Sequence, residues 1–126
     1  MRRTSLLATI ALTGIAASVV AGQQSKDDAL DPVRVAANTH RIAFENAFVR
    51  VLDVRIPAGS IEPRHRHPHG LSVYFTDWNA KVTVDGREPA VNQRTSGTFA
   101  WSDAVVHTVE NVSTSEAHVL RIELKY

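Results

Sequence analysis

Short runs of β-branched and aromatic residues, separated by turn signals, most constrain what this chain can fold into. The run VRVLDVRI at residues 49–56 is followed by the turn sequence PAG at 57–59. Such runs, recurring at intervals of about 8–12 residues, are typical of a β-sandwich or β-barrel. We therefore predict an all-β fold, a single small barrel whose sheets curl together to reduce their exposed edges.

Further strands are predicted along the rest of the chain. They cover residues 71–75, 80–84, 98–101, 105–110 and 117–124, and Asp85-Gly86 is a strong hairpin signal from which REPAV at 87–91 returns. The stretch RVAANTHRIAFENAF at 34–48 has some helical character but runs directly into the strand at 49–56, so no helix is predicted there. The last strand, 117–124, is the candidate for an exposed sheet edge.

The first 22 residues differ in composition from the rest. Arg2 and Arg3 precede an uncharged stretch of 16 residues, 6–21, and Val20 and Gly22 suit the −3 and −1 positions of a cleavage site. This is the anatomy of a secretory signal peptide, and the stretch is shorter than the roughly 20 residues that span a membrane. We predict a signal peptide at 1–22, a flexible lead-in at 23–32 and a domain at 33–126. The product is exported, periplasmic or secreted, by the Sec or the twin-arginine route.

Composition excludes several classes of protein. The chain has no cysteine, which excludes disulfides, thiolate metal sites and cysteine nucleophiles. Without residues 1–22 it carries 12 basic and 13 acidic residues, so it is close to neutral. That balance does not suit a nucleic-acid partner, and no stable membrane anchor is expected.

Histidines are concentrated in EPRHRHPHGLS, residues 62–72. Side chains at i and i+2 of a strand point to the same face, so His65 and His67 can converge on one metal ion. Arg64 and Arg66 then point to the other face as solvated charges. Pro68 lacks a backbone donor and should end the regular pairing. The alternative is a solvated loop that is rich in histidine.

A third metal ligand must come from elsewhere in the chain. His107 lies in the β-like stretch AVVHTVEN, 40 residues after His67, where a neighbouring strand can bring it to the same cavity. The alternative for His107 is a hydrogen-bonded residue inside the barrel. His69 lies beyond Pro68 and suits the rim of a pocket better than a metal site. His40 and His118 are expected to be surface or strand residues with no special role.

These motifs resemble those of the cupin superfamily. The first cupin motif begins with a glycine, five residues and then His-x-His, as in Gly59, His65 and His67. The second motif ends in a histidine shortly before an asparagine, as in His107 and Asn111. The resemblance covers most of residues 45–125 and is strongest to small, often exported, bacterial cupin-domain proteins. It implies a jelly-roll barrel with a metal-binding cavity, and sheet-edge pairing into a homodimer is a further family-based expectation.

The chain departs from the family pattern at the first motif's glutamate. Leu71 and Ser72 occupy the two positions where that carboxylate is expected. The resemblance then implies a three-histidine site of His65, His67 and His107. Imidazole ligands suit Fe, Zn, Cu or Ni better than Mn, and three protein ligands leave coordination positions open. The predicted cofactor is thus a divalent transition metal of unspecified identity.

Two classes of function follow from this interpretation. A metal-dependent enzyme would carry out oxygenase, isomerase or lyase chemistry, with no catalytic residue assigned. The alternative is a non-catalytic cupin that binds a small molecule or a metal, or a metal-free degenerate cupin. His69, Ser72, Tyr74 and Trp101 are the residues expected to line the pocket in either case.

Overall fold

Two antiparallel β-sheets make up most of the computed structural model, which describes residues 28–126. The all-β prediction is confirmed, apart from one turn of helix. The predicted signal peptide at 1–22 and the first part of the lead-in, 23–27, lie outside the described residues. Between residues 28 and 126, no helix has the length and apolar character needed to cross a membrane.

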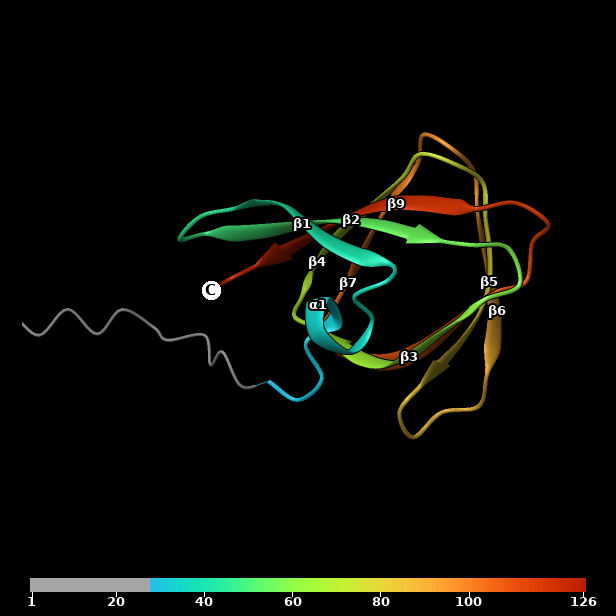
Figure 1. Ribbon diagram of the computed structural model, residues 1–126, viewed down its shortest axis with the longest axis horizontal. Coiled ribbons are helices and arrows are strands. Elements are labelled where there is room, and N and C mark those ends of the chain that lie inside the picture. Colours follow the sequence, from blue (N-terminus) through green and yellow to red (C-terminus); the bar gives the residue numbers. More distant parts are fainter. Residues whose placement is uncertain (1–27) are drawn as a thin grey trace, which may run out of the picture.

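One sheet has five strands and the other has four. In spatial order, the five-stranded sheet contains β1 (His40–Glu45), β2 (Val49–Ile56), β9 (Ala117–Leu124), β4 (Gly70–Tyr74) and β7 (Phe99–Ser102). The four-stranded sheet contains β3 (Ile61–His67), β8 (Val105–Asn111), β5 (Trp78–Val84) and β6 (Ala90–Arg94). Figure 1 shows the strands of both sheets arranged around a common interior, as in a barrel.

The strongest strand and turn signals of the sequence predicted the structure well. Strands β2 and β9 have the predicted bounds, 49–56 and 117–124. The chain turns at Asp85-Gly86 between β5 and β6, and Gly86 has a φ of +72°. Glycine adopts such a positive φ without the steric penalty that a Cβ would bring, which is why the Asp-Gly pair is a reliable hairpin signal.

The segment before β2 differs from the prediction. It contains the one-turn helix α1 (Pro32–Val35) and the strand β1, neither of which the sequence analysis assigned. The Asp31 side chain accepts a hydrogen bond from the Val33 amide at 3.2 Å, and Pro32 starts the helix with its φ already fixed. A four-residue helix is too short to show a hydrophobic period. Only His40 is buried in β1, so the strand lacks alternation as well.

Strand β9 is not an edge strand, contrary to the prediction. It pairs with β2 on one side and with β4 on the other, over most of its length. Its alternating pattern reflects two faces of a central strand, one toward the barrel interior and one away from it. The edge strands of the two sheets are β1 and β7, and β3 and β6. Strand β9 therefore offers no free sheet edge for the expected homodimer, and the homodimer itself stays a prediction.

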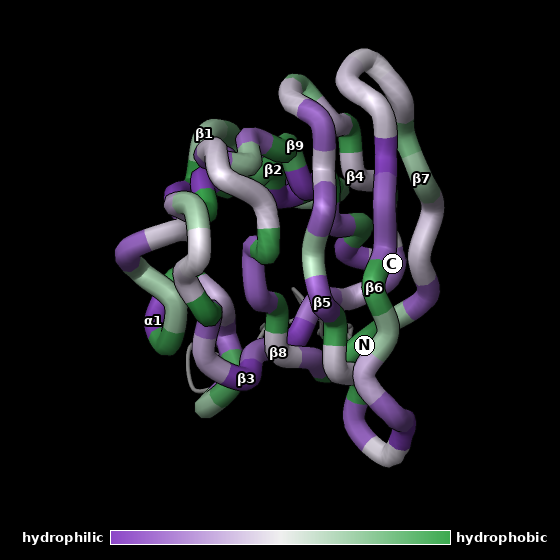
Figure 2. Tube along the Cα trace, turned by 90° about the vertical axis from the view of Figure 1, so that its right-hand side faces the viewer, coloured by the Kyte–Doolittle hydropathy of each residue, from purple (hydrophilic) through white to green (hydrophobic). Residues whose placement is uncertain are grey.

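The interior of the barrel changes character along its length. The inward-facing pairs of β2 and β9 run from Ile56 opposite Ala117 near one end to Arg50 opposite Glu123 near the other. The apolar core comprises Leu52, Val54, Ile56, Tyr74, Ala80, Val109, Ala117 and Val119. Figure 2 shows hydrophilic and hydrophobic residues interspersed along the strands, as expected where both faces of each strand are used. Beyond this apolar core, charged side chains and imidazoles occupy the rest of the interior.

We predict that Gly70→Ala destabilises the fold. A Cβ at Gly70 would lie 2.0 Å from the carbonyl oxygen of Ile122, a backbone atom of the paired strand β9. Relief requires β4 and β9 to separate, so we expect a loss of about 2–4 kcal/mol in the free energy of unfolding, measured by urea denaturation. Gly59→Ala, with φ +71° and open space around its Cβ position, should cost only about 1 kcal/mol. Equal losses for the two variants would contradict the close strand approach.

Candidate metal centre

His65 and His67 point into the barrel from β3. Their exposed fractions are 0% and 5%, whereas Arg64 and Arg66 between and beside them are about half exposed. Arg64 pairs with Asp85 and Arg66 with Asp28, both at the outer surface. The predicted division of this segment into an inner histidine face and an outer arginine face is confirmed, and β3 ends at His67, just before Pro68.

An irregularity in β3 brings a carboxylate to the same inner face. Glu62 is buried although it lies three residues before His65, a spacing that regular alternation would put on opposite faces. The register of β3 against β8 shifts between Glu62 and His65, which is the signature of a β-bulge. Pro63 lies within this interval, where its missing amide donor costs no ladder hydrogen bond. A position for Glu62 in the interior was not expected from the sequence.

His107 meets His65 across the pairing of β8 with β3. The two residues are direct partners in the strand register, so their side chains lie on the same face. Their Nε2 atoms are 3.1 Å apart, and the ring of His107 is also close to that of His67, with centroids 5.4 Å apart. The three histidines singled out in the sequence are thus brought together by the fold.

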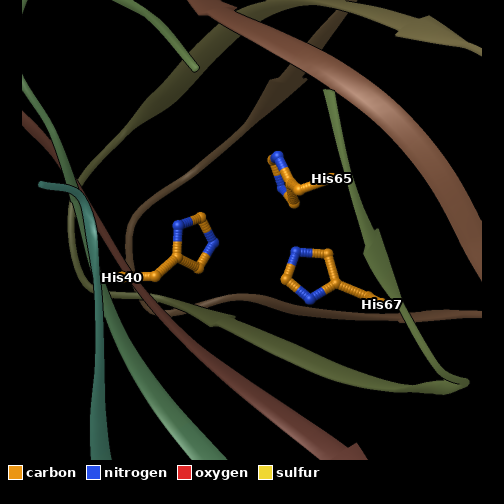
Figure 3. A group of neighbouring side chains, drawn as sticks. All are labelled: His40, His65 and His67. Carbon is orange, nitrogen blue, oxygen red and sulfur yellow. The ribbon is translucent and has the colours of Figure 1, made fainter. Parts of the chain in front are cut away.

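His40, at the start of β1, completes a buried group that the sequence analysis missed. Only 3% of its surface is exposed, so His40 is a strand residue, as one of the two expectations had it, and not a surface residue. His40, His65 and His67 offer ring nitrogens that all lie within 4.8 Å of one another, close enough to hold a metal ion. Figure 3 shows the three rings, from β1 and β3, turned toward a shared space. No local pattern around His40 signals this position.

Each ring of this group is held through its Nδ1 atom. His65 Nδ1 lies 2.7 Å from the carbonyl oxygen of Pro63, which can only accept, so this nitrogen carries the proton and donates. His67 Nδ1 lies 2.7 Å from Glu123 Oε1, and His40 Nδ1 lies 3.0 Å from Thr39 Oγ1, which in turn hydrogen-bonds Glu62 Oε1. A hydrogen bond at Nδ1 fixes the ring orientation and leaves Nε2 unprotonated, which is the usual arrangement of metal-binding histidines. The Nε2 lone pairs of His65 and His67 are therefore available together.

Burial keeps these histidines neutral. Desolvation and the neighbouring imidazoles lower the pKa of His40 to about 2 and that of His107 to about 3. Burial also lowers the pKa of His65, and places that of His67 well below its usual value. Neutral imidazole is the form that binds metals, so proton competition at these nitrogens is weak near neutral pH.

A buried network of charged side chains holds the His67 ring of this group in place. Glu123, fully buried on β9, receives Arg50 Nε on Oε2 at 2.6 Å and His67 on Oε1. Arg50 also donates to Asp31 Oδ2 at 3.0 Å, which ties the segment before α1 to the barrel. The end of the predicted lead-in is thus attached to the domain, and Arg66 further bonds the Leu30 carbonyl through its backbone amide.

A cavity of about 250 Å³ adjoins the histidines. The imidazoles of His40, His65, His67 and His107 line it, with Glu62, Arg121 and a wall of mostly apolar side chains. Ser72, Tyr74 and Trp101, expected to be pocket residues, are among the lining residues. His69 is not; its ring lies beside that of Trp101, with centroids 5.9 Å apart. At the position expected for the motif glutamate, Ser72 accepts a hydrogen bond from Arg121 at 3.3 Å.

Comparison with known proteins identifies the architecture. No protein-family model matches the chain, and no curated protein matches it. Among solved structures, a cupin domain from Bordetella pertussis Tohama I is similar with a TM-score of 0.65 and 26% identity, over 69% of this chain and 92% of that chain.

Two further cupin structures share the fold at lower identity. An RmlC-like cupin with a double-stranded β-helix fold from Methanocaldococcus jannaschii has a TM-score of 0.55 and 13% identity, over 68% of this chain and 77% of its own. A cupin superfamily protein from Desulfitobacterium hafniense has a TM-score of 0.53 and 12% identity, over 69% and 76%. The chain therefore has the double-stranded β-helix fold of the cupins, and the predicted jelly-roll barrel is confirmed.

We predict that Arg50→Ala strongly destabilises the protein. The change leaves Glu123 buried with its charge opposed by no direct cationic partner, so the free energy of unfolding should fall by about 3 kcal/mol or more. Arg55→Ala is the matched control, because Arg55 lies on the same strand but is half exposed and pairs with Asp53 and Glu116 at the surface. Urea denaturation should show this large loss in the free energy of unfolding for Arg50→Ala and only a small change for Arg55→Ala. Comparable losses would contradict the role given to the buried network.

Proposed function

We propose that this chain is an exported cupin that holds a divalent transition metal on its buried histidines and acts on a small molecule in the adjoining cavity. The observation that carries the proposal is the convergence of buried imidazoles whose Nδ1 atoms are hydrogen-bonded and which each offer a ring nitrogen within 4.8 Å of the others. Export rests on the composition of residues 1–22 alone.

His65 and His67 are the centre of the proposed metal site. They belong both to the ligand set suggested by the sequence and to the buried group with His40. His107 is the third ligand implied by the cupin motifs, and its Nε2 faces that of His65 at 3.1 Å. We propose that the site draws on all four imidazoles, with His40 and His107 completing the coordination begun by the two β3 histidines.

The donor set limits the metal. Nitrogen ligands from imidazole suit Fe, Zn, Cu and Ni, and the chain has no thiolate to offer. Glu123 bonds Nδ1 of His67 directly, and Glu62 reaches Nδ1 of His40 through the hydroxyl of Thr39, so both carboxylates act through the histidines. A hydrogen-bonded carboxylate raises the basicity of the imidazole it holds and thereby strengthens metal binding.

We propose that this metal site is catalytic. A bound metal would supply a Lewis acid or a redox centre, and oxygenase, isomerase and lyase reactions all use one of these. The residues of the chain orient the ligands through Nδ1, and the apolar wall limits the access of water to the cavity. Polar lining groups, among them Ser72 and Tyr74, are available to orient a substrate.

Metal content tests the proposal. The purified full-length protein, stripped with a chelator and then titrated with Fe, Zn, Cu or Ni, should take up roughly one ion per chain at micromolar concentrations. His65→Ala and His67→Ala should abolish this uptake, and His40→Ala and His107→Ala should each weaken it. Elemental analysis after desalting gives the stoichiometry.

His118→Ala is the matched control for these variants. His118 bonds Asp53 at 2.6 Å on the other face of β9 and should leave metal uptake unchanged. A wild-type protein that takes up none of the four metals would overturn the metal site. Uptake without turnover, in oxygen-consumption and substrate screens, would favour the alternative of a binding protein.

A further inference from the structure

Arg121 is a buried cation in the wall of the cavity. It lies on the inner face of β9, only 5% exposed, and its side chain is among those that line the cavity. One terminal nitrogen donates to the Pro68 carbonyl at 2.7 Å and the other to Ser72 Oγ at 3.3 Å. The buried Nε has no hydrogen-bond partner. Two of the five guanidinium N–H donors are thus used, both by neutral acceptors.

The protein does not neutralise this guanidinium through direct contact. Among residues 28–126, no ion pair involves Arg121, whereas Arg50, the other buried arginine, pairs with both Glu123 and Asp31. Glu123 lies two residues from Arg121, but Arg50 and His67 occupy its two oxygens. Burial lowers the pKa of Arg121, and the nearby charge of Glu123 opposes this shift without cancelling it, so keeping the charge in this environment has a net cost. A buried charge without a close counter-ion is costly, and a bound anion would offset that cost.

We propose that Arg121 anchors the carboxylate of a small organic acid that enters the cavity. Guanidinium binds carboxylates through parallel N–H donors, and Arg121 retains free donors on a side chain held in place by Pro68 and Ser72. This gives a substrate class to the function proposed above. It rests on the small-molecule role of the cavity, and it does not depend on the metal.

The cavity favours a small monoanion. Its volume of about 250 Å³ is below the range of about 300–1,000 Å³ that suits drug-sized ligands. Val54, Val82, Val109 and Val119 contribute to an apolar wall that suits a hydrocarbon body. One buried guanidinium matches the single charge of a carboxylate, whereas a phosphate dianion would call for additional donors. Arg94, the other arginine of the lining, is exposed.

The position of Arg121 also connects the anion to the histidines. Burial and the neighbouring imidazoles lower the pKa of His67 and His107, and the charge of Arg121 lowers both further. The guanidinium is therefore close enough to act electrostatically on the metal-binding group. A carboxylate on Arg121 would hold the rest of its molecule beside the histidines, which is where a reacting group is needed.

Paired acids and amides test this proposal without metal. The chelator-treated full-length protein is titrated with acetate, propionate, butyrate and benzoate, and with the corresponding amides, at constant ionic strength. Calorimetry and the thermal unfolding midpoint report binding. At least one acid should bind saturably, and its amide should bind at least about tenfold more weakly, because the charge-assisted hydrogen bonds are lost. No binding by any acid, or equal binding of acid and amide, would overturn the proposal.

Variants of Arg121 test whether this residue binds the carboxylate. Arg121→Met should weaken binding of the acid at least about tenfold and should leave the unfolding midpoint of the free protein unchanged or raised, because a costly buried charge is removed. Arg55→Met is the control at an exposed arginine outside the cavity lining and should retain binding. A lower midpoint for Arg121→Met together with unchanged acid binding would mean a purely structural role.

Three further outcomes separate this proposal from the alternatives. Tighter binding of phenyl phosphate than of benzoate would overturn the carboxylate assignment. Acid binding that depends on Arg121 in a protein that takes up no Fe, Zn, Cu or Ni would support the anchor while the metal proposal fails. Metal uptake without acid binding would support the metal site and overturn the carboxylate anchor.

Discussion

The carboxylate of Glu123 joins the framework of the barrel to its histidines. It is fully buried, and it binds Arg50 on one oxygen and His67 on the other. A buried carboxylate is tolerated only when its partners are in place, so the position of the His67 ring is coupled to the stability of the network. Arg50 extends the same network to Asp31, so the segment that precedes α1 is held by it as well.

This network explains why a group of buried imidazoles is stable in the fold. Neutral rings with Nδ1 hydrogen bonds have one nitrogen satisfied, and the other faces a space shared with further rings. Protonation of that second nitrogen is disfavoured by burial and by the neighbouring rings. A metal ion can still bind there, because coordinate bonds to several lone pairs compensate for its lost hydration. The same arrangement therefore resists protons and suits a metal.

Much of the fold was predictable from local sequence. Strands such as β2 and β9 show alternation or β-branched runs along their length, and the inward histidines of β3 follow from a period of two. His40 was not predictable, because β1 shows no alternation and the residue is brought to the interior by the pairing of β1 with β2. Glu62 was concealed by the bulge in β3, since a local register shift leaves no pattern of its own.

Strand β9 shows the limit of hydrophobic patterning most clearly. Its apolar face, with Leu120 and Ile122, is half buried, whereas Arg121 and Glu123 are buried inside the barrel. Patterning alone would assign the apolar face to the interior. The reversal is possible because Glu123 is paired in full by Arg50 and His67, and such pairing depends on residues distant in sequence.

The charges around the cavity then determine what it can accept. Asp31 and Glu123 are engaged by Arg50, and burial raises the pKa of Glu62 to about 7, so its charge near neutral pH is incomplete. The guanidinium of Arg121 has no such partner, and a divalent ion held by neutral imidazoles would add charge of the same sign. The absence of a carboxylate at Leu71 and Ser72 removes the negative group that would have offset this charge. With such an ion bound, the two arginines and the ion outweigh Asp31, Glu123 and the partly charged Glu62, and in an interior of low polarity that positive excess favours an anionic ligand over a neutral one of the same shape.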